Sequence, residues 1–237
     1  MELARSTFRT AFEHGRHRFW FLLTTALIVF IPLGLLETIS HGVEINTDDG
    51  IDPIDLLRAV SIALAALLGE VFYAGTIASV VAKGPEFEPT FGGLIRSIPW
   101  LTIIAIDLIF AFSVAFGLVA LFIPGLYIYG RWVLAATLAD IDHVRTREAL
   151  RRSAALTKGH RVVVVTVLFA VMIVSEILSE AFQHVIEALE GEDLVAEWIS
   201  ASGSAIILSP IFALLCAAFV IELRARKAPA APETSAL

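Results

Sequence analysis

Three charged residues lie deep inside hydrophobic stretches of this sequence: Glu70, Asp107 and Arg131. A charge at the centre of a bilayer costs about 2.5 to 3.5 kcal/mol, so such residues usually face a bundle interior or a cavity and pair with one another. Two acids and one base in this setting suit two roles. They can relay protons or ions in a transporter, or they can form a buried polar cluster that holds the helices together.

Each of these charges belongs to a row of small residues at four-residue spacing, which allows close helix contact in lipid. The rows are Ala66, Glu70, Ala74, Ala78, Ala82; Asp107, Ala111, Ala115; and Tyr127, Arg131, Ala135, Ala139. At 1.5 Å per residue, the three charges lie about 12 to 20 Å from the basic ends of their stretches. We therefore expect Arg131 to bridge Asp107, with Glu70 nearby. The packing role is favoured, because the chain lacks the paired inverted halves with broken helices that many transporters have.

The composition requires a membrane. Of the 237 residues, 57% are hydrophobic and 17% charged, and the mean hydropathy is +0.81. A soluble domain carries about 25% charged residues. The hydrophobic stretches are Phe19–Ile39, Leu56–Ala82, Trp100–Ile123, Leu126–Ile141, Val162–Ser179 and Ile199–Ile221. Since about 20 residues cross the hydrocarbon core as a helix, we predict an all-α transmembrane bundle of about six spans, with a hairpin at Pro124-Gly125 between the third and fourth.

The distribution of charge predicts the orientation of these spans. All but two of the 17 lysines and arginines fall on one side of a six-span topology, the exceptions being Arg58 and Arg131. The loops on the other side are acidic. Because basic residues are retained in the cytoplasm, both termini are expected to be cytoplasmic, in a multi-pass protein of a bacterial inner membrane.

The predicted domain organisation has three parts. Residues 1–18 form an amphipathic cytoplasmic segment, 19–222 the transmembrane domain, and 223–237 a disordered cytoplasmic tail. Within the second part, residues 147–158 are expected to form an interfacial helix, with Thr146 as N-cap and Gly159 just past its end. Its clustered arginines suit contact with anionic lipid headgroups, as do those of the N-terminal segment. For both segments, charge that serves only to set the topology is an equally good interpretation, and neither indicates nucleic-acid binding.

No established catalytic or cofactor motif is present. The sequence has no HExxH, GxSxG, Walker-type loop or GxGxxG. Its single cysteine, Cys216, lies in an apolar stretch and suits a small buried side chain. The segment 46–55 resembles a calcium loop but has Gly50 where a ligand is needed. We therefore expect no enzyme activity, no metal and no cofactor.

One stretch, 122–161, carries a recognisable pattern: a Pro-Gly pair, a span with an arginine, an acid at its end, then a basic helix that closes on Lys-Gly. The matching positions are Pro124, Gly125, Arg131, Asp140, Glu148, Ala149, Leu150, Ser153, Leu156, Lys158 and Gly159. This pattern resembles bacterial multi-span proteins known as the membrane domain of glycerophosphoryl diester phosphodiesterase, and related inner-membrane families. Two features depart from it: Ala136 stands where many relatives have proline, and 143–145 replaces a glycine-containing turn.

The resemblance implies a membrane module without the catalytic half, since the diesterase chemistry of those enzymes belongs to a separate soluble domain. We therefore expect a non-catalytic module that assembles with, anchors or regulates a protein partner. The alternative is a small permease or ion-coupled transporter that uses Glu70, Asp107 and Arg131. An open cavity reaching Glu70 would favour transport, and a dry packed core would favour the module.

Overall fold

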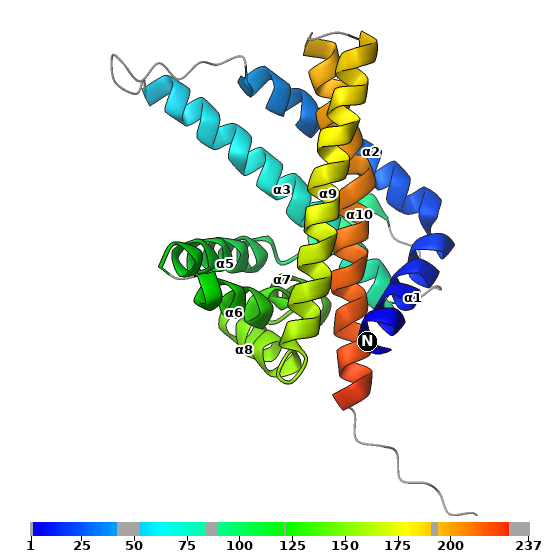
Figure 1. The fold of residues 1–237 in the computed structure, drawn as a ribbon, viewed down its shortest axis with the longest axis vertical. Coiled ribbons are helices and arrows are strands. Elements are labelled where there is room, and N and C mark those ends of the chain that lie inside the picture. The colour runs from blue at the N-terminus through cyan, green and yellow to red at the C-terminus, as the bar shows by residue number, and fades with distance from the viewer. Residues whose placement is uncertain (1, 42–52, 84–89, 121, 191–193, 228–237) are drawn as a thin grey trace, which may run out of the picture.

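The computed structural model describes residues 2–41, 53–83, 90–120, 122–190 and 194–227, and these contain helices and turns with no strand (Figure 1). The predicted all-α class is confirmed. In chain order the helices are α1 (Glu2–His17), α2 (Phe19–His41), α3 (Pro53–Lys83), α4 (Phe91–Ser97), α5 (Trp100–Ala120), α6 (Phe122–Trp132), α7 (Ala135–Asp142), α8 (Thr146–Leu156), α9 (Arg161–Glu190) and α10 (Leu194–Lys227).

Four helices in the described ranges are long and apolar enough to cross a membrane, which agrees with a membrane-embedded protein. The qualifying segments are Phe19–Leu36, Trp100–Gly117, Arg161–Ile186 and Trp198–Lys227, within α2, α5, α9 and α10. Helix α3 has 31 residues and begins at Pro53, where its fixed φ and missing N–H suit the first position of a helix.

The predicted fourth span, 126–141, is not a single helix. It is divided into α6, of 11 residues, and α7, of 8, and neither alone reaches the about 20 residues that a span needs. The break falls at Val133 and Leu134. Leu134 and Ala135 are successive residues and both are fully buried. After the break, α7 packs against α3 and α8.

The hairpin between α5 and α6 also differs from the prediction. Pro124 and Gly125 do not form the break, because both lie in the first turn of α6, where proline removes no helical hydrogen bond. Gly125 instead allows the two helices to meet. A Cβ added to Gly117 of α5 would lie 2.9 Å from the Cα of Gly125. The pair is a point of backbone contact, and α5 and α6 pack along each other from there.

Helices α9 and α10 lie side by side along the long axis, and α3 leans away from them at one end (Figure 1). The largest core cluster joins α7, α9 and α10 through Leu138, Leu168 and Phe219, all at most 1% exposed. Helix α2 approaches α10 at Gly34, where an added Cβ would lie 2.2 Å from the Ser202 hydroxyl oxygen. The short helix α4, which we did not predict, buries Leu94.

Helix α1 packs along the C-terminal part of α10. Its buried face consists of Leu3, Thr7 and Ala11, and the Thr10 hydroxyl donates a 2.7 Å hydrogen bond to Glu222. The predicted amphipathic segment is therefore a helix. The tail was predicted to begin at residue 223, which is wrong, because α10 continues to Lys227. The rest of that tail, 228–237, lies outside the described residues.

Candidate functional site

A cavity of about 1010 Å³ lies between α3 and α5 on one side and α9 and α10 on the other, with α6 and α7 at one end. Figure 1 shows α3 tilted away from the α9–α10 pair. Serines and threonines contribute many of the polar lining groups. Those on α9 and α10 are Ser175, Ser179, Ser200, Ser204 and Ser209. A lining this polar is compatible with water or a polar solute inside the bundle.

Four acidic side chains line the cavity, and none of its described lining residues is basic. The acids are Glu70 on α3, Asp107 on α5, Asp140 on α7 and Glu176 on α9. Glu70 and Glu176 are exposed, Asp107 is half-buried and Asp140 is 1% exposed. The acids therefore run from an accessible part of the cavity to an enclosed one.

The structure brings two of the three predicted charges together. Glu70 and Asp107 line the same cavity and interact electrostatically. Neither forms an ion pair with a basic residue of the described chain. Two carboxylates that face each other repel when both are ionised. A cation or a proton in the cavity would relieve that repulsion.

Arg131 does not join these acids. Its side chain is exposed, it is absent from the cavity lining, and its guanidinium carbon lies 5.7 Å from the ring centre of Trp132. The expected bridge from Arg131 to Asp107 is therefore not formed among the described residues. Arg131 sits in the last turn of α6, beside the break that ends this helix. The continuous fourth span assumed from the sequence would have placed it differently.

Asp140 replaces Arg131 as the third charge at the cavity. The Ser79 hydroxyl donates a 3.0 Å hydrogen bond to Asp140 Oδ2, while Oδ1 is buried and has no hydrogen-bond partner. Lys83, at the end of α3, interacts electrostatically with Asp140 from outside the lining. One oxygen of this buried carboxylate therefore has no hydrogen-bond partner among the described residues.

Aromatic side chains share the cavity with the acids. Phe110 and Tyr129 have ring centres 5.6 Å apart, and the buried Tyr129 hydroxyl has no hydrogen-bond partner. Phe110 follows Asp107 by three residues on α5, so both project from one face of the helix. An acid and an aromatic ring on one face can contact the same bound cation.

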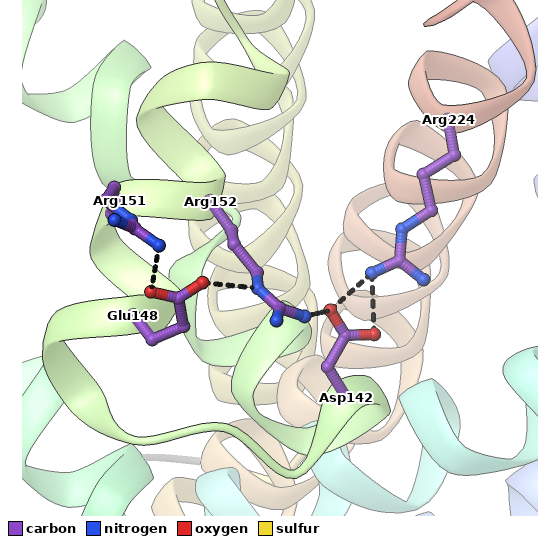
Figure 2. Close-up of polar contacts among 5 residues, drawn as sticks. All are labelled: Asp142, Glu148, Arg151, Arg152 and Arg224. Carbon is purple, nitrogen blue, oxygen red and sulfur yellow. Dashed lines mark hydrogen bonds and ion pairs between the residues drawn. The ribbon is translucent and has the colours of Figure 1, made fainter. Parts of the chain in front are cut away.

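A second polar cluster lies at the corner between α7 and α8, outside the cavity lining (Figure 2). Asp142 accepts hydrogen bonds from Arg224 of α10 at 2.7 Å and from Arg152 of α8 at 2.8 Å. Arg152 also bonds Glu148, which pairs with Arg151. Partial burial favours a higher pKa for Asp142, but the bonds from Arg224 and Arg152 outweigh it and hold that pKa below its ordinary value. Hydrogen bonds from Arg152 and Arg151 likewise lower the pKa of Glu148.

The remaining positions of the sequence pattern support this corner. The buried Ser153 hydroxyl donates to the Arg131 carbonyl at 2.9 Å, which ties α8 to α6, and Ala149 is fully buried. Gly159, just past α8, has a φ of 88°, a left-handed conformation that suits glycine. Lys158 is exposed. Helix α8 spans 146–156 with Arg145 as N-cap, so the predicted bounds were two residues too late at the C-terminus and Thr146 is its first residue.

Comparisons of the chain with models of protein families, with curated proteins and with solved structures found no match. The site is therefore argued from its geometry alone. In the described part of the chain, no three His, Cys, Asp or Glu side chains gather as a metal ion would require. Cys216 is buried and lines the cavity, as a small apolar side chain would.

Sequence reasoning missed three contributors to the cavity: Ser79 as the partner of Asp140, the Tyr129 hydroxyl, and Glu176. Glu176 falls within the predicted fifth span, Val162–Ser179, but was not counted among the charges inside the spans; the structure places it on α9, in the cavity lining. For Asp140 the sequence offered one indication, its position in the family-like pattern of residues 122–161. Nothing in the sequence indicated that Ser79 would face it.

Proposed function

We propose that this protein is a small ion-coupled permease, in which a cation enters the acidic cavity between α3, α5, α7, α9 and α10. One observation carries the proposal: Glu70 and Asp107 meet in an open cavity without a basic partner in the described chain. Intramembrane acids in a cavity are typical of proton and ion pathways. A cluster that served only packing would need a base between the two acids or a proton held on one of them.

The spacing of the acids supports a path along the bundle. Glu70 and Ser79, the partner of Asp140, are both on α3, and nine residues of helix correspond to about 14 Å. A proton or small cation moving between Glu70 and Asp140 would therefore cover a large part of the about 30 Å hydrocarbon core. Asp107 lies on α5 and lines the same cavity.

The proposed topology has about six crossings in a bacterial inner membrane, with both termini in the cytoplasm. Helix α3 and the α6–α7 pair supply the two crossings beyond the four long apolar helices. Supporting this orientation, α1, α8 and the C-terminal end of α10 lie together, since Lys227 donates to the Ala155 carbonyl and Thr10 to Glu222. Exposed basic residues of α1 and α8, with Phe12 at 70% exposure, suit contact with anionic headgroups.

Flux measurements test the proposal. Purified protein in liposomes that contain a pH-sensitive dye should take up protons under an inside-negative potential faster than empty liposomes. The double variant Glu70→Gln/Asp107→Asn should fall to the level of empty liposomes. Glu180→Gln changes an exposed acid of α9 outside the cavity lining and should match the wild type. Wild-type uptake equal to that of empty liposomes would overturn the proposal.

The second candidate is the non-catalytic module that the resemblance suggests. Its supporting observation is that Glu148, Ala149, Ser153 and Gly159 act in the corner between α7 and α8 and not in the cavity. If the protein is such a module, substitutions in this corner should disrupt the complex with its partner and should have no effect on ion flux. Absence of flux together with a stable partner complex would favour it.

A further inference from the structure

We infer that the cavity binds an organic cation, a protonated amine or quaternary group on an aromatic or branched apolar body, as the cargo of the proposed permease. This inference rests on the proposed function and adds the chemical class of the substrate. Four features support it: the charge of the lining, its aromatic side chains, two buried polar atoms without hydrogen-bond partners, and the volume of the cavity.

The charge of the lining selects for cations. The four charged side chains of the described lining are all carboxyl groups. Two basic residues discussed above lie outside the lining: Arg131 is exposed beside Trp132, and Lys83 interacts electrostatically with Asp140. An anion would meet carboxylates without a compensating base and would be repelled.

Two buried polar atoms lack protein partners at the enclosed end. Asp140 is 1% exposed and its Oδ1 accepts no hydrogen bond, while the buried Tyr129 hydroxyl is also unpartnered. Both residues line the cavity. Leaving a buried polar group unpaired is unfavourable, and more so when the group is charged. A cation bound in the cavity would offset the charge of the Asp140 carboxylate without direct contact with its buried oxygen.

The size and the aromatic groups favour an organic cation over a metal ion. Sites for small organic molecules commonly occupy about 300 to 1000 Å³, and this cavity is of about 1010 Å³. The described acids do not gather in a group able to hold a metal ion. Phe110 and Tyr129 both line this cavity, with ring centres 5.6 Å apart, and aromatic rings attract organic cations.

Ligand binding to the purified full chain in detergent tests the inference. Rhodamine 6G, a fluorescent organic cation, is titrated and followed by fluorescence anisotropy. We expect saturable binding that tetraphenylphosphonium displaces and that triphenylphosphine oxide, a neutral molecule of similar shape, does not. Asp107→Asn should weaken binding at least tenfold, whereas the control Glu180→Gln should leave it unchanged.

A steric pair tests the location of the ligand without changing charge. Ala111 and Ala115 are both exposed on α5, one turn apart, and Ala111 alone of the two lines the cavity. Ala111→Phe fills the space and should abolish binding, whereas Ala115→Phe should bind as the wild type does. Gel filtration and circular dichroism establish that both variants fold.

The outcomes separate this inference from the proposed function. Displacement by the neutral analogue, or unchanged affinity in both Asp107→Asn and Ala111→Phe, would overturn the inference. Proton flux that depends on Glu70 and Asp107, without any binding of organic cations, would overturn the inference and leave the proposed function standing. Absence of both binding and flux would overturn both.

Discussion

Ser79 and Asp140 form a buried hydrogen bond between α3 and α7, with 3.0 Å from the serine hydroxyl to Oδ2. The bond links residues that are 61 positions apart and closes the inner end of the cavity. Asp140 has the lowest exposure of the four acids in the lining, so the serine supplies a hydrogen bond that water cannot easily replace. This bond therefore fixes the position of the Asp140 carboxylate, a residue of the cavity lining.

Ser79→Ala should lower the free energy of unfolding by about 1 to 3 kcal/mol, because it leaves Asp140 without its hydrogen-bond donor. Unfolding in mixed detergent micelles, followed by tryptophan fluorescence, measures the change. Ser113→Ala, at a half-buried serine of α5 outside the cavity lining, is the control and should change it by less than about 0.5 kcal/mol. Equal effects of the two substitutions would contradict the assigned role of Ser79.

Gly117→Ala should destabilise the protein by about 1 to 3 kcal/mol through overpacking. The added Cβ would lie 2.9 Å from the Cα of Gly125, and backbone cannot move aside as a flexible side chain can. Gly92→Ala is the matched control, because a Cβ there meets no atom within 4 Å. That control should be neutral or slightly stabilising, since alanine favours a helix over glycine. Thermal unfolding of the two variants in the same detergent makes the comparison.

Much of the fold was predictable because hydrophobic length and the distribution of charge are properties of the sequence. The helical class and the amphipathic N-terminal helix followed from such local signals. The division of the predicted span 126–141 into α6 and α7 did not follow from local signals. The break falls at Val133 and Leu134, neither of which is proline or glycine, so the residues at the break carry no local signal for it.

Part of the candidate site could also be predicted from local properties of the sequence. Depth along a helix follows from residue number, which placed Glu70 and Asp107 at one cavity. The direction in which a side chain points depends on the rotation of its helix within the bundle, which residue number does not give, and Arg131 lies outside the cavity lining. Contacts between distant residues, such as Ser79 with Asp140, depend on helix packing and have no local signature.

Asp142→Asn should remove a pH-dependent part of the stability. The folded pKa of Asp142 lies below its ordinary value of 3.8, so its ion pairs with Arg224 and Arg152 stabilise the protein fully above about pH 4. That contribution is lost as the pH falls through the folded pKa. We expect the variant to be less stable by about 1 kcal/mol at pH 7, a size typical of partly exposed ion pairs.

Thermal unfolding of the wild type and of Asp142→Asn between pH 7 and pH 3 measures this difference. The gap between the two proteins should narrow below about pH 4, when protonation of Asp142 makes the wild type resemble the variant. Glu13→Gln is the control, since it changes an exposed acid that pairs with Arg9 within α1. A gap that stays constant down to pH 3 would show that the charge of Asp142 is not the source of its effect.

His143→Gly should stabilise the protein by about 1 kcal/mol. His143 ends α7 with a φ of 51°, the left-handed region that costs an L residue about 1 to 2 kcal/mol and costs glycine almost nothing. His143→Val should have the opposite sign, because a β-branched side chain tolerates this conformation least. Arg145→Gly is the control at the N-cap of α8, where φ is −71°, so glycine relieves no strain there. Thermal midpoints of the three variants, measured together, should therefore place His143→Gly above the wild type and the other two at or below it. Stabilisation by Arg145→Gly as large as that by His143→Gly would instead point to a general effect of glycine in this loop.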